Sequence, residues 1–120
     1  MSFGQIVNRI PHARVSLPGH GAEFEVDFVI DTAFDGELAL PSHLASSLDQ
    51  INSGWRSYQL ANGDIIVAPY CEIYLSWDGE PRRTEVAIID GNPLLGVELL
   101  EGNLVQIEMT IGGEVHIEPL

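Results

Sequence analysis

The chain has 120 residues and a formal net charge of −13 at pH 7, and its only basic residues besides histidine are five arginines. This length predicts a single domain over residues 1–120, with a core that needs no disulfide or metal. Such a surface repels nucleic acid and anionic lipid, and no apolar run approaches the roughly 18 residues of a membrane span. The N-terminus lacks the apolar run of a signal peptide, so we expect a cytoplasmic protein.

Short alternating apolar segments, separated by turn signals, run along the whole chain. In chain order they are residues 13–17, 23–30, 65–77, 83–90, 104–111 and 114–119. The turn signals are "PGHG" at 18–21 and the pairs Asn62-Gly63, Asp78-Gly79 and Gly112-Gly113. Asn-Gly, Asp-Gly and Gly-Gly between such segments predict β-hairpins.

Only two segments suggest a helix. Residues 41–48 place apolar side chains on one face, and Ser42 after Pro41 is the expected N-cap. Residues 92–102 predict one helical turn after Gly96, closed by Gly102. The chain is therefore expected to form a mostly-β domain built from hairpins, with one or two short helices.

The stretch "FVIDTAFDGELALP" at residues 28–41 places Asp31 at the end of an apolar strand, where an unpaired charge is costly. A calcium loop starting at Asp31 would have Ala33 and Ser42 at two ligand positions, which argues against calcium. The four histidines are scattered without metal-ligand spacing, so we expect no metal and no cofactor. Catalysis and an ordinary acidic turn remain as interpretations of Asp31.

A catalytic interpretation of Asp31 requires a second carboxylate. Two carboxylates within hydrogen-bond reach share one proton, so that one can activate a water while the other donates to a carbonyl oxygen. The chain has only one such Asp-Thr-small tripeptide. The second carboxylate would therefore come from another subunit across a two-fold axis, which predicts a homodimer.

Two motifs in this order, "FVIDTAFDG" and "NPLLGVELL", resemble the retropepsin-like aspartic proteases, and in particular their small stand-alone bacterial members. The resemblance covers roughly residues 12–102. It implies a closed retropepsin-like β-barrel that dimerises to form one active site. It also implies an aspartic endopeptidase that uses no metal and forms no covalent intermediate.

The resemblance assigns roles to individual positions of the first motif. Asp31 would be the catalytic carboxylate. The hydroxyl of Thr32 would bond across the two-fold axis, and the backbone N–H of Ala33 would help to hold the carboxylate. Asp35 matches a position that often contacts the substrate backbone, although the same residues taken alone suggest that Asp35 and Glu37 are a solvated turn.

Two further assignments lie outside the first motif. Asn62 and Gly63 would sit at the tip of the flap, a hairpin that closes over substrate. Leu94, Leu95 and Gly96 would form a strand behind the catalytic loop.

The chain departs from the family pattern at two positions. Ala33 stands where glycine is usual, and Val97 stands where viral relatives often carry an arginine that pairs with the acid at position 35. A second hypothesis is therefore a retropepsin-fold dimer that binds peptides or proteins with weak or lost catalysis. A third is a small β-domain that serves as a partner of a larger system.

Several other side chains have a simpler structural interpretation. Cys71 lies in a strand and is expected to be a small core residue. Tyr58 and the two tryptophans are expected to pack in the core or the sheet rather than line a peptide groove. Arg82 and Arg83 are expected to lie on the solvated face of a strand.

Overall fold

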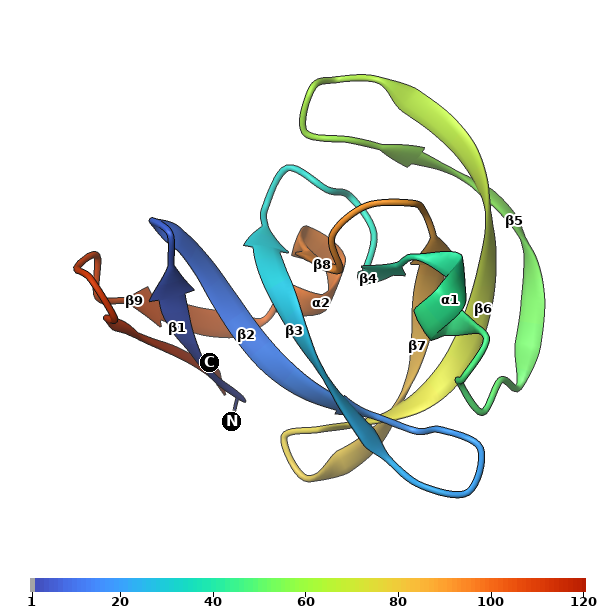
Figure 1. The fold of residues 1–120 in the computed structure, drawn as a ribbon, viewed down its shortest axis with the longest axis horizontal. Helices are drawn as coiled ribbons and strands as arrows, with labels where there is room; N and C mark the ends of the chain where they lie inside the picture. Colours follow the sequence, from blue (N-terminus) through green and yellow to red (C-terminus); the bar gives the residue numbers. More distant parts are fainter. Residues whose placement is uncertain (1) are drawn as a thin grey trace.

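The structure is a computed structural model that describes residues 2–120 (Figure 1). The described chain forms ten strands and two four-residue helices, which confirms the mostly-β prediction with short helices. The strands are β1 (Ser2–Val7), β2 (Ile10–Leu17), β3 (Phe24–Asp31), β4 (Leu38–Leu40), β5 (Asn52–Gln59), β6 (Ile65–Trp77), β7 (Glu80–Ile88), β8 (Leu94–Gly96), β9 (Asn103–Ile107) and β10 (Glu114–Pro119). The helices are α1 (Ser42–Ala45) and α2 (Val97–Leu100).

All the described strands belong to one curved sheet in the order β5-β6-β7-β4-β8-β3-β2-β1-β10-β9. Neighbouring strands run antiparallel except for the pairs β3–β8 and β4–β7, which are parallel. The sheet has two free ends, β5 and β9, so the closed barrel expected from the sequence is not confirmed. In Figure 1 the long β5–β6 hairpin arches over the end of β3.

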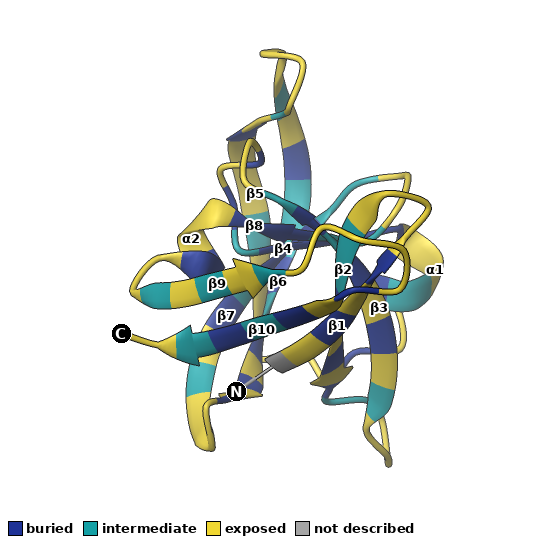
Figure 2. Cartoon of the chain, turned by 90° about the vertical axis from the view of Figure 1, so that its left-hand side faces the viewer, coloured by how far each residue is buried: buried dark blue, intermediate teal, exposed yellow. Residues whose placement is uncertain are grey.

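Two apolar clusters hold the sheet together. The larger lies between the curved strands and includes the fully buried Phe28, Leu38 and Ile73. The smaller lies beneath the β5–β6 hairpin and contains Phe34, Ala39, Tyr58, Ala68 and Ala87. Successive side chains of a strand point to opposite faces, so β6 contributes to both clusters. Figure 2 shows this alternation along β9, where intermediate and exposed residues follow one another. The smaller cluster connects the hairpin to the loop after β3.

The turn pairs expected from the sequence all lie between strands of the structure. Asp78 (φ 53°) and Gly79 (φ 80°) form the β6–β7 turn in the left-handed region that tight hairpins require. The sequence did not predict β1, nor the β1–β2 turn at Asn8 (φ 51°) and Arg9 (φ 67°). The expected strand at 104–111 was too long, because β9 ends at Ile107.

The first helix begins differently from the prediction. Pro41 occupies the N-cap position with extended dihedrals, no side chain caps the helix, and Ser42 is the first helical residue. The N-cap assigned to Ser42 was therefore wrong. None of the described helices is long and apolar enough to cross a membrane.

The core assignments hold for most of the side chains considered. Cys71 is fully buried, as predicted, and burial raises the pKa of its thiol to about 11. Tyr58 and Trp77 are also buried. Trp55 is the exception, since 71% of it is exposed on the outer face of the β5–β6 hairpin.

Candidate functional site

Asp31 is the last residue of β3 and opens the loop to β4, here called the Asp31 loop (residues 31–37). Its Oδ1 accepts a hydrogen bond of 3.0 Å from the backbone N–H of Ala33. The Asp31 carbonyl accepts a second bond, of 3.2 Å, from Phe34 N–H. Asp31 is half-buried, and no ion pair is found for it among the described residues. The carboxylate is therefore fixed by the backbone of its own loop and faces no cation.

Thr32 and Ala33 are both exposed, so the tip of the Asp31 loop lies at the molecular surface. Ala33 is not among the described residues with positive φ, and its conformation is one that alanine adopts without strain. Its N–H makes the bond to the Asp31 carboxylate that the sequence predicted. The alanine that replaces the usual glycine is thus compatible with this contact.

The strand β8 passes directly behind the Asp31 loop. It pairs in parallel with β3, where Asp31 faces Gly96, and antiparallel with β4. Gly96 N–H donates to the Glu37 carbonyl at 2.8 Å. A Cβ on Gly96 would stand 2.1 Å from the Gly36 carbonyl oxygen, a contact that no side chain tolerates. The close crossing therefore explains the glycine in the Leu-Leu-Gly motif.

The two leucines of the motif serve different clusters. Leu95 is fully buried in the larger cluster, and the half-buried Leu94 packs against the smaller one. The structure thus brings Leu94, Leu95 and Gly96 together with Asp31, as the sequence analysis placed them.

Asn62 and Gly63 lie in the loop of the β5–β6 hairpin, and Gly63 has a φ of +87°. The Asn62 side chain bonds both the backbone N–H and the carboxylate of Asp64, each at 2.9 Å. Asn62 also lines a cavity of about 370 Å³ that Asp31 borders from the other side. The hairpin tip and the candidate carboxylate therefore share one cavity.

Asp35 ties the Asp31 loop to the hairpin. Its Oδ1 accepts the backbone N–H of Gln59 at 3.0 Å, and its own N–H donates to the Gln59 carbonyl at 3.3 Å. Gln59 is the last residue of β5, at the base of the hairpin loop. The contact of Asp35 with substrate stays a prediction. The solvated-turn interpretation did not include the hydrogen bonds between Asp35 and β5.

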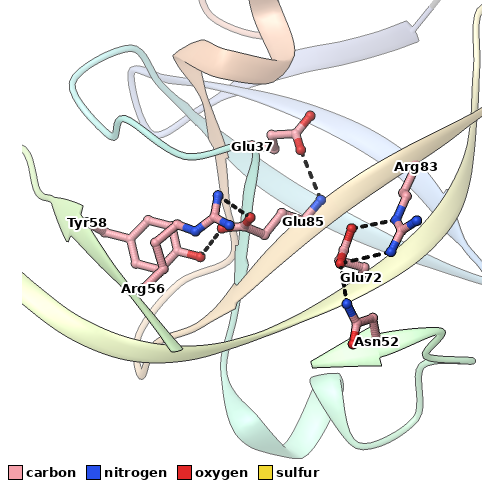
Figure 3. Close-up of polar contacts among 7 residues, drawn as sticks. All are labelled: Glu37, Asn52, Arg56, Tyr58, Glu72, Arg83 and Glu85. Atoms are coloured by element: carbon pink, nitrogen blue, oxygen red, sulfur yellow. Dashed lines mark hydrogen bonds and ion pairs between the residues drawn. The ribbon is translucent and has the colours of Figure 1, made fainter. Parts of the chain in front are cut away.

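A polar cluster that the sequence analysis did not identify includes Tyr58, the residue before Gln59, and Figure 3 draws all of its members except Arg82. We call it the Glu85 cluster, and it contains Glu37, Arg56, Tyr58, Arg82 and Glu85. Arg56 pairs with Glu85 at 2.8 Å, and the Tyr58 hydroxyl donates to the other Glu85 oxygen. The Glu85 N–H donates to Glu37 at 3.0 Å, and Glu37 also pairs with Arg82.

The cluster is largely shielded from solvent. The Glu85 and Glu37 side chains are only 15% and 12% exposed. Burial, together with the hydrogen bond to Glu85, raises the pKa of the Tyr58 hydroxyl well above its usual range. Tyr58 is therefore a neutral donor to a charged acceptor at physiological pH.

The expectations about surface charges were wrong for Arg82 and Glu37, whereas Arg83 is exposed as expected. Arg82 and Arg83 lie on opposite faces of β7, where Arg82 pairs with Glu37 and Arg83 pairs with Glu72. Glu37 is not a solvated turn residue, because it is half-buried between Arg82 and the Glu85 backbone. The alternation of side chains along β7 separates the two arginines, but their partners depend on strand register.

No family model, curated protein or solved structure matches this chain. Within residues 2–120, no three histidine, cysteine, aspartate or glutamate side chains come together to hold a metal ion.

Proposed function

We propose that this chain is one subunit of a homodimeric aspartic endopeptidase with a retropepsin-like active site. The observation that carries the proposal is the crossing of β8 behind the Asp31 loop, beneath a hairpin whose tip borders the same cavity. Asp31, which has no cationic partner among residues 2–120, thus borders an open cavity beneath the hairpin.

The second carboxylate of the site is the Asp31 of a second copy. One carboxylate, ionised, takes a proton from a water whose oxygen attacks the peptide carbonyl carbon. The other, protonated, donates its proton to the carbonyl oxygen. The resulting tetrahedral intermediate then breaks its C–N bond: the carboxylate that took the water proton gives it to the leaving amine nitrogen, and the other carboxylate takes a proton from a hydroxyl of the intermediate, which becomes the new carboxylic acid. The two carboxylates end with one proton between them, as they began.

The surface beside Thr32 supports the shared site. A hollow of about 690 Å³ next to Thr32 and Asp35 is bordered by the exposed Val97 and by Asn103. The buried Oδ1 of Asn103 accepts no hydrogen bond from any part of the chain that the structure describes. A second copy seated here would cover apolar surface and bring the Thr32 hydroxyls together across the two-fold axis.

The hairpin supplies the substrate-binding wall in this proposal. Gly63 at its tip permits the backbone changes of closure, and the exposed Asn62 lies over the cavity. An extended peptide would bind as an added strand between the hairpin and the Asp31 loop.

The test is a comparison of Asp31→Asn with Asp27→Asn. Both residues lie on β3 and both changes replace a carboxylate by an amide, but Asp27 pairs with His12 away from the cavity. We expect the wild type and D27N to cleave members of a fluorogenic peptide library at acidic to neutral pH. D31N should lose activity by roughly 10²–10⁴-fold or more while remaining dimeric.

The outcomes separate the alternatives. Residual cleavage at near wild-type rate by D31N would contradict the mechanism, and cleavage by a rigorously monomeric protein would contradict the shared site. A wild-type dimer that binds a statine-type transition-state mimic no better than a plain peptide, and cleaves nothing, would instead identify a peptide-binding module.

A further inference from the structure

The Glu85 carboxylate holds the base of the β5–β6 hairpin, and each of its two oxygens has a partner. One Glu85 oxygen pairs with Arg56 and the other accepts the Tyr58 hydroxyl, and both partners come from β5 (Figure 3). The Arg56 guanidinium also lies 5.0 Å from the centre of the Tyr70 ring on β6. Glu85 on β7 thus binds the edge strand β5 across the intervening strand β6.

Tyr58 carries this attachment to the Asp31 loop. Its buried ring packs on Phe34, with ring centroids 5.8 Å apart. The next residue, Gln59, makes the two backbone bonds with Asp35. Phe34 and Asp35 directly follow Ala33, whose N–H holds the Asp31 carboxylate. Only Thr32 and Ala33 therefore separate the fixed part of the loop from Asp31.

A second carboxylate on the same sheet provides an internal comparison. Glu72 lies directly opposite Glu85 on β6, binds Arg83 through both oxygens and accepts a bond from Asn52. We call Asn52, Glu72 and Arg83 the Glu72 cluster. Two like charges directly opposite one another destabilise a sheet, so each glutamate needs its own arginine. The Glu72 cluster includes no residue of the Asp31 loop.

We propose that Tyr58, anchored by Glu85 and Arg56, is a positioning residue for the active site. It fixes the base of the hairpin on Phe34 and Asp35 and thereby holds Asp31 in the geometry for reaction. This inference rests on the proposed function for its catalytic part, whereas the physical link to the loop can be measured without any activity.

The test compares Tyr58→Phe with Arg83→Gln in the full dimeric protein. Tyr58→Phe keeps the ring on Phe34 and removes only the hydroxyl that Glu85 accepts. R83Q removes an arginine–glutamate pair of the same sheet that does not touch the loop. The first readout is amide hydrogen exchange at the N–H groups of Phe34 and Asp35, which bond to Asp31 and Gln59.

We expect exchange at these two amides to become about tenfold faster in Y58F, the range that loss of a hydrogen bond to a charged group gives. R83Q should leave both amides unchanged. The second readout is kinetic: kcat should fall about tenfold in Y58F with KM changed less than threefold, because positioning acts on the reacting geometry. Glu85→Gln, which keeps an acceptor for Tyr58, should recover part of the activity that Glu85→Ala loses.

Unchanged exchange at both amides in Y58F would overturn the proposal, as would faster exchange accompanied by an unchanged kcat. Equal effects in R83Q would show that Tyr58 acts only through the overall stability of the protein, and this result would also overturn the proposal. Failure of the proposed function can be distinguished from failure of this inference. In that case the wild-type protein would cleave no peptide, but the exchange rates would still show whether Tyr58 holds the Asp31 loop.

Discussion

The two arginine–glutamate clusters have similar chemistry but different surroundings. The Glu72 and Glu85 side chains are 19% and 15% exposed, and their arginines are both about half exposed. Arg83 and Asn52 donate hydrogen bonds to Glu72 and lower the pKa of its carboxyl. Glu85 instead accepts the hydroxyl of the buried Tyr58 and is joined by its backbone to Glu37. What an ion pair does for function thus depends on the residues attached to it.

The largest expected difference between the clusters is in stability. Glu85→Ala leaves the Tyr58 hydroxyl buried without an acceptor and Arg56 without its partner. We expect a loss of about 1–3 kcal/mol in the free energy of unfolding, measured by denaturant titration. Glu72→Ala should cost clearly less, because its partners stay in contact with water. Equal losses in the two variants would show that burial of Tyr58 does not distinguish the clusters.

The second prediction concerns alkaline pH. Burial raises the pKa of Tyr58 in the folded protein above the value of roughly 10 expected in the unfolded chain. The folded state then holds a proton that the unfolded state releases, so stability falls as the pH rises beyond the unfolded pKa. Ultraviolet absorbance should show Tyr58 ionising only as the protein unfolds. In Y58F the stability should decline less steeply above this pH.

A tyrosine at position 58 that titrates in the folded protein with an ordinary pKa would contradict this account. Tyr74, which is exposed and lies beside Arg83 rather than Glu85, provides the reference tyrosine through Tyr74→Phe. An equal change in Y74F and Y58F would show that the loss of any tyrosine hydroxyl, rather than the burial of Tyr58, sets the alkaline decline.

The smallest expected effect is that of Glu98. Burial, followed by the like charges of Glu37 and Glu85, raises the pKa of the Glu98 carboxyl. A raised carboxyl pKa means that the folded state binds a proton more tightly, so Glu98 lowers stability as the pH rises beyond its unfolded pKa, and the whole loss is present above its folded pKa. Glu98→Gln should therefore raise the melting temperature at pH 7 and have little effect near pH 3.

The matched control for this variant is Glu25→Gln, which removes one charge from the exposed surface of β3. If both variants raised the melting temperature equally, the gain would reflect the net charge of −13 rather than the neighbours of Glu98. A gain limited to Glu98→Gln would show that the burial of Glu98 and the carboxylates beside it cause the effect.

Local sequence patterns predicted the hairpins that carry glycine turns, whereas the crossing at Gly96 was expected only from the family resemblance. Asp78-Gly79 needs positive φ at both positions, and Gly96 needs the absence of a Cβ, so the residue type itself reveals the geometry. The Asn8-Arg9 turn adopts the same conformation without glycine, and the sequence therefore gave no signal for β1.

The Glu85 cluster could not be predicted for a different reason. Its members come from the Asp31 loop, β5 and β7, and Arg56 reaches Glu85 only because of the register of β5, β6 and β7. Register depends on long-range packing rather than on local sequence. Arg56 and Tyr58 are two residues apart in β5, so their side chains lie on the same face of the sheet. This shared face is the only feature of the cluster that could be predicted from the sequence.

The most direct test of the shared Asp31 site is to mix wild-type and D31N subunits. If one carboxylate from each subunit is required, mixed dimers are inactive and activity after subunit exchange falls with the square of the wild-type fraction. Mixing with D27N should leave the activity constant. A decline in direct proportion to the wild-type fraction, or full activity in mixed dimers, would contradict a site built from two copies of Asp31.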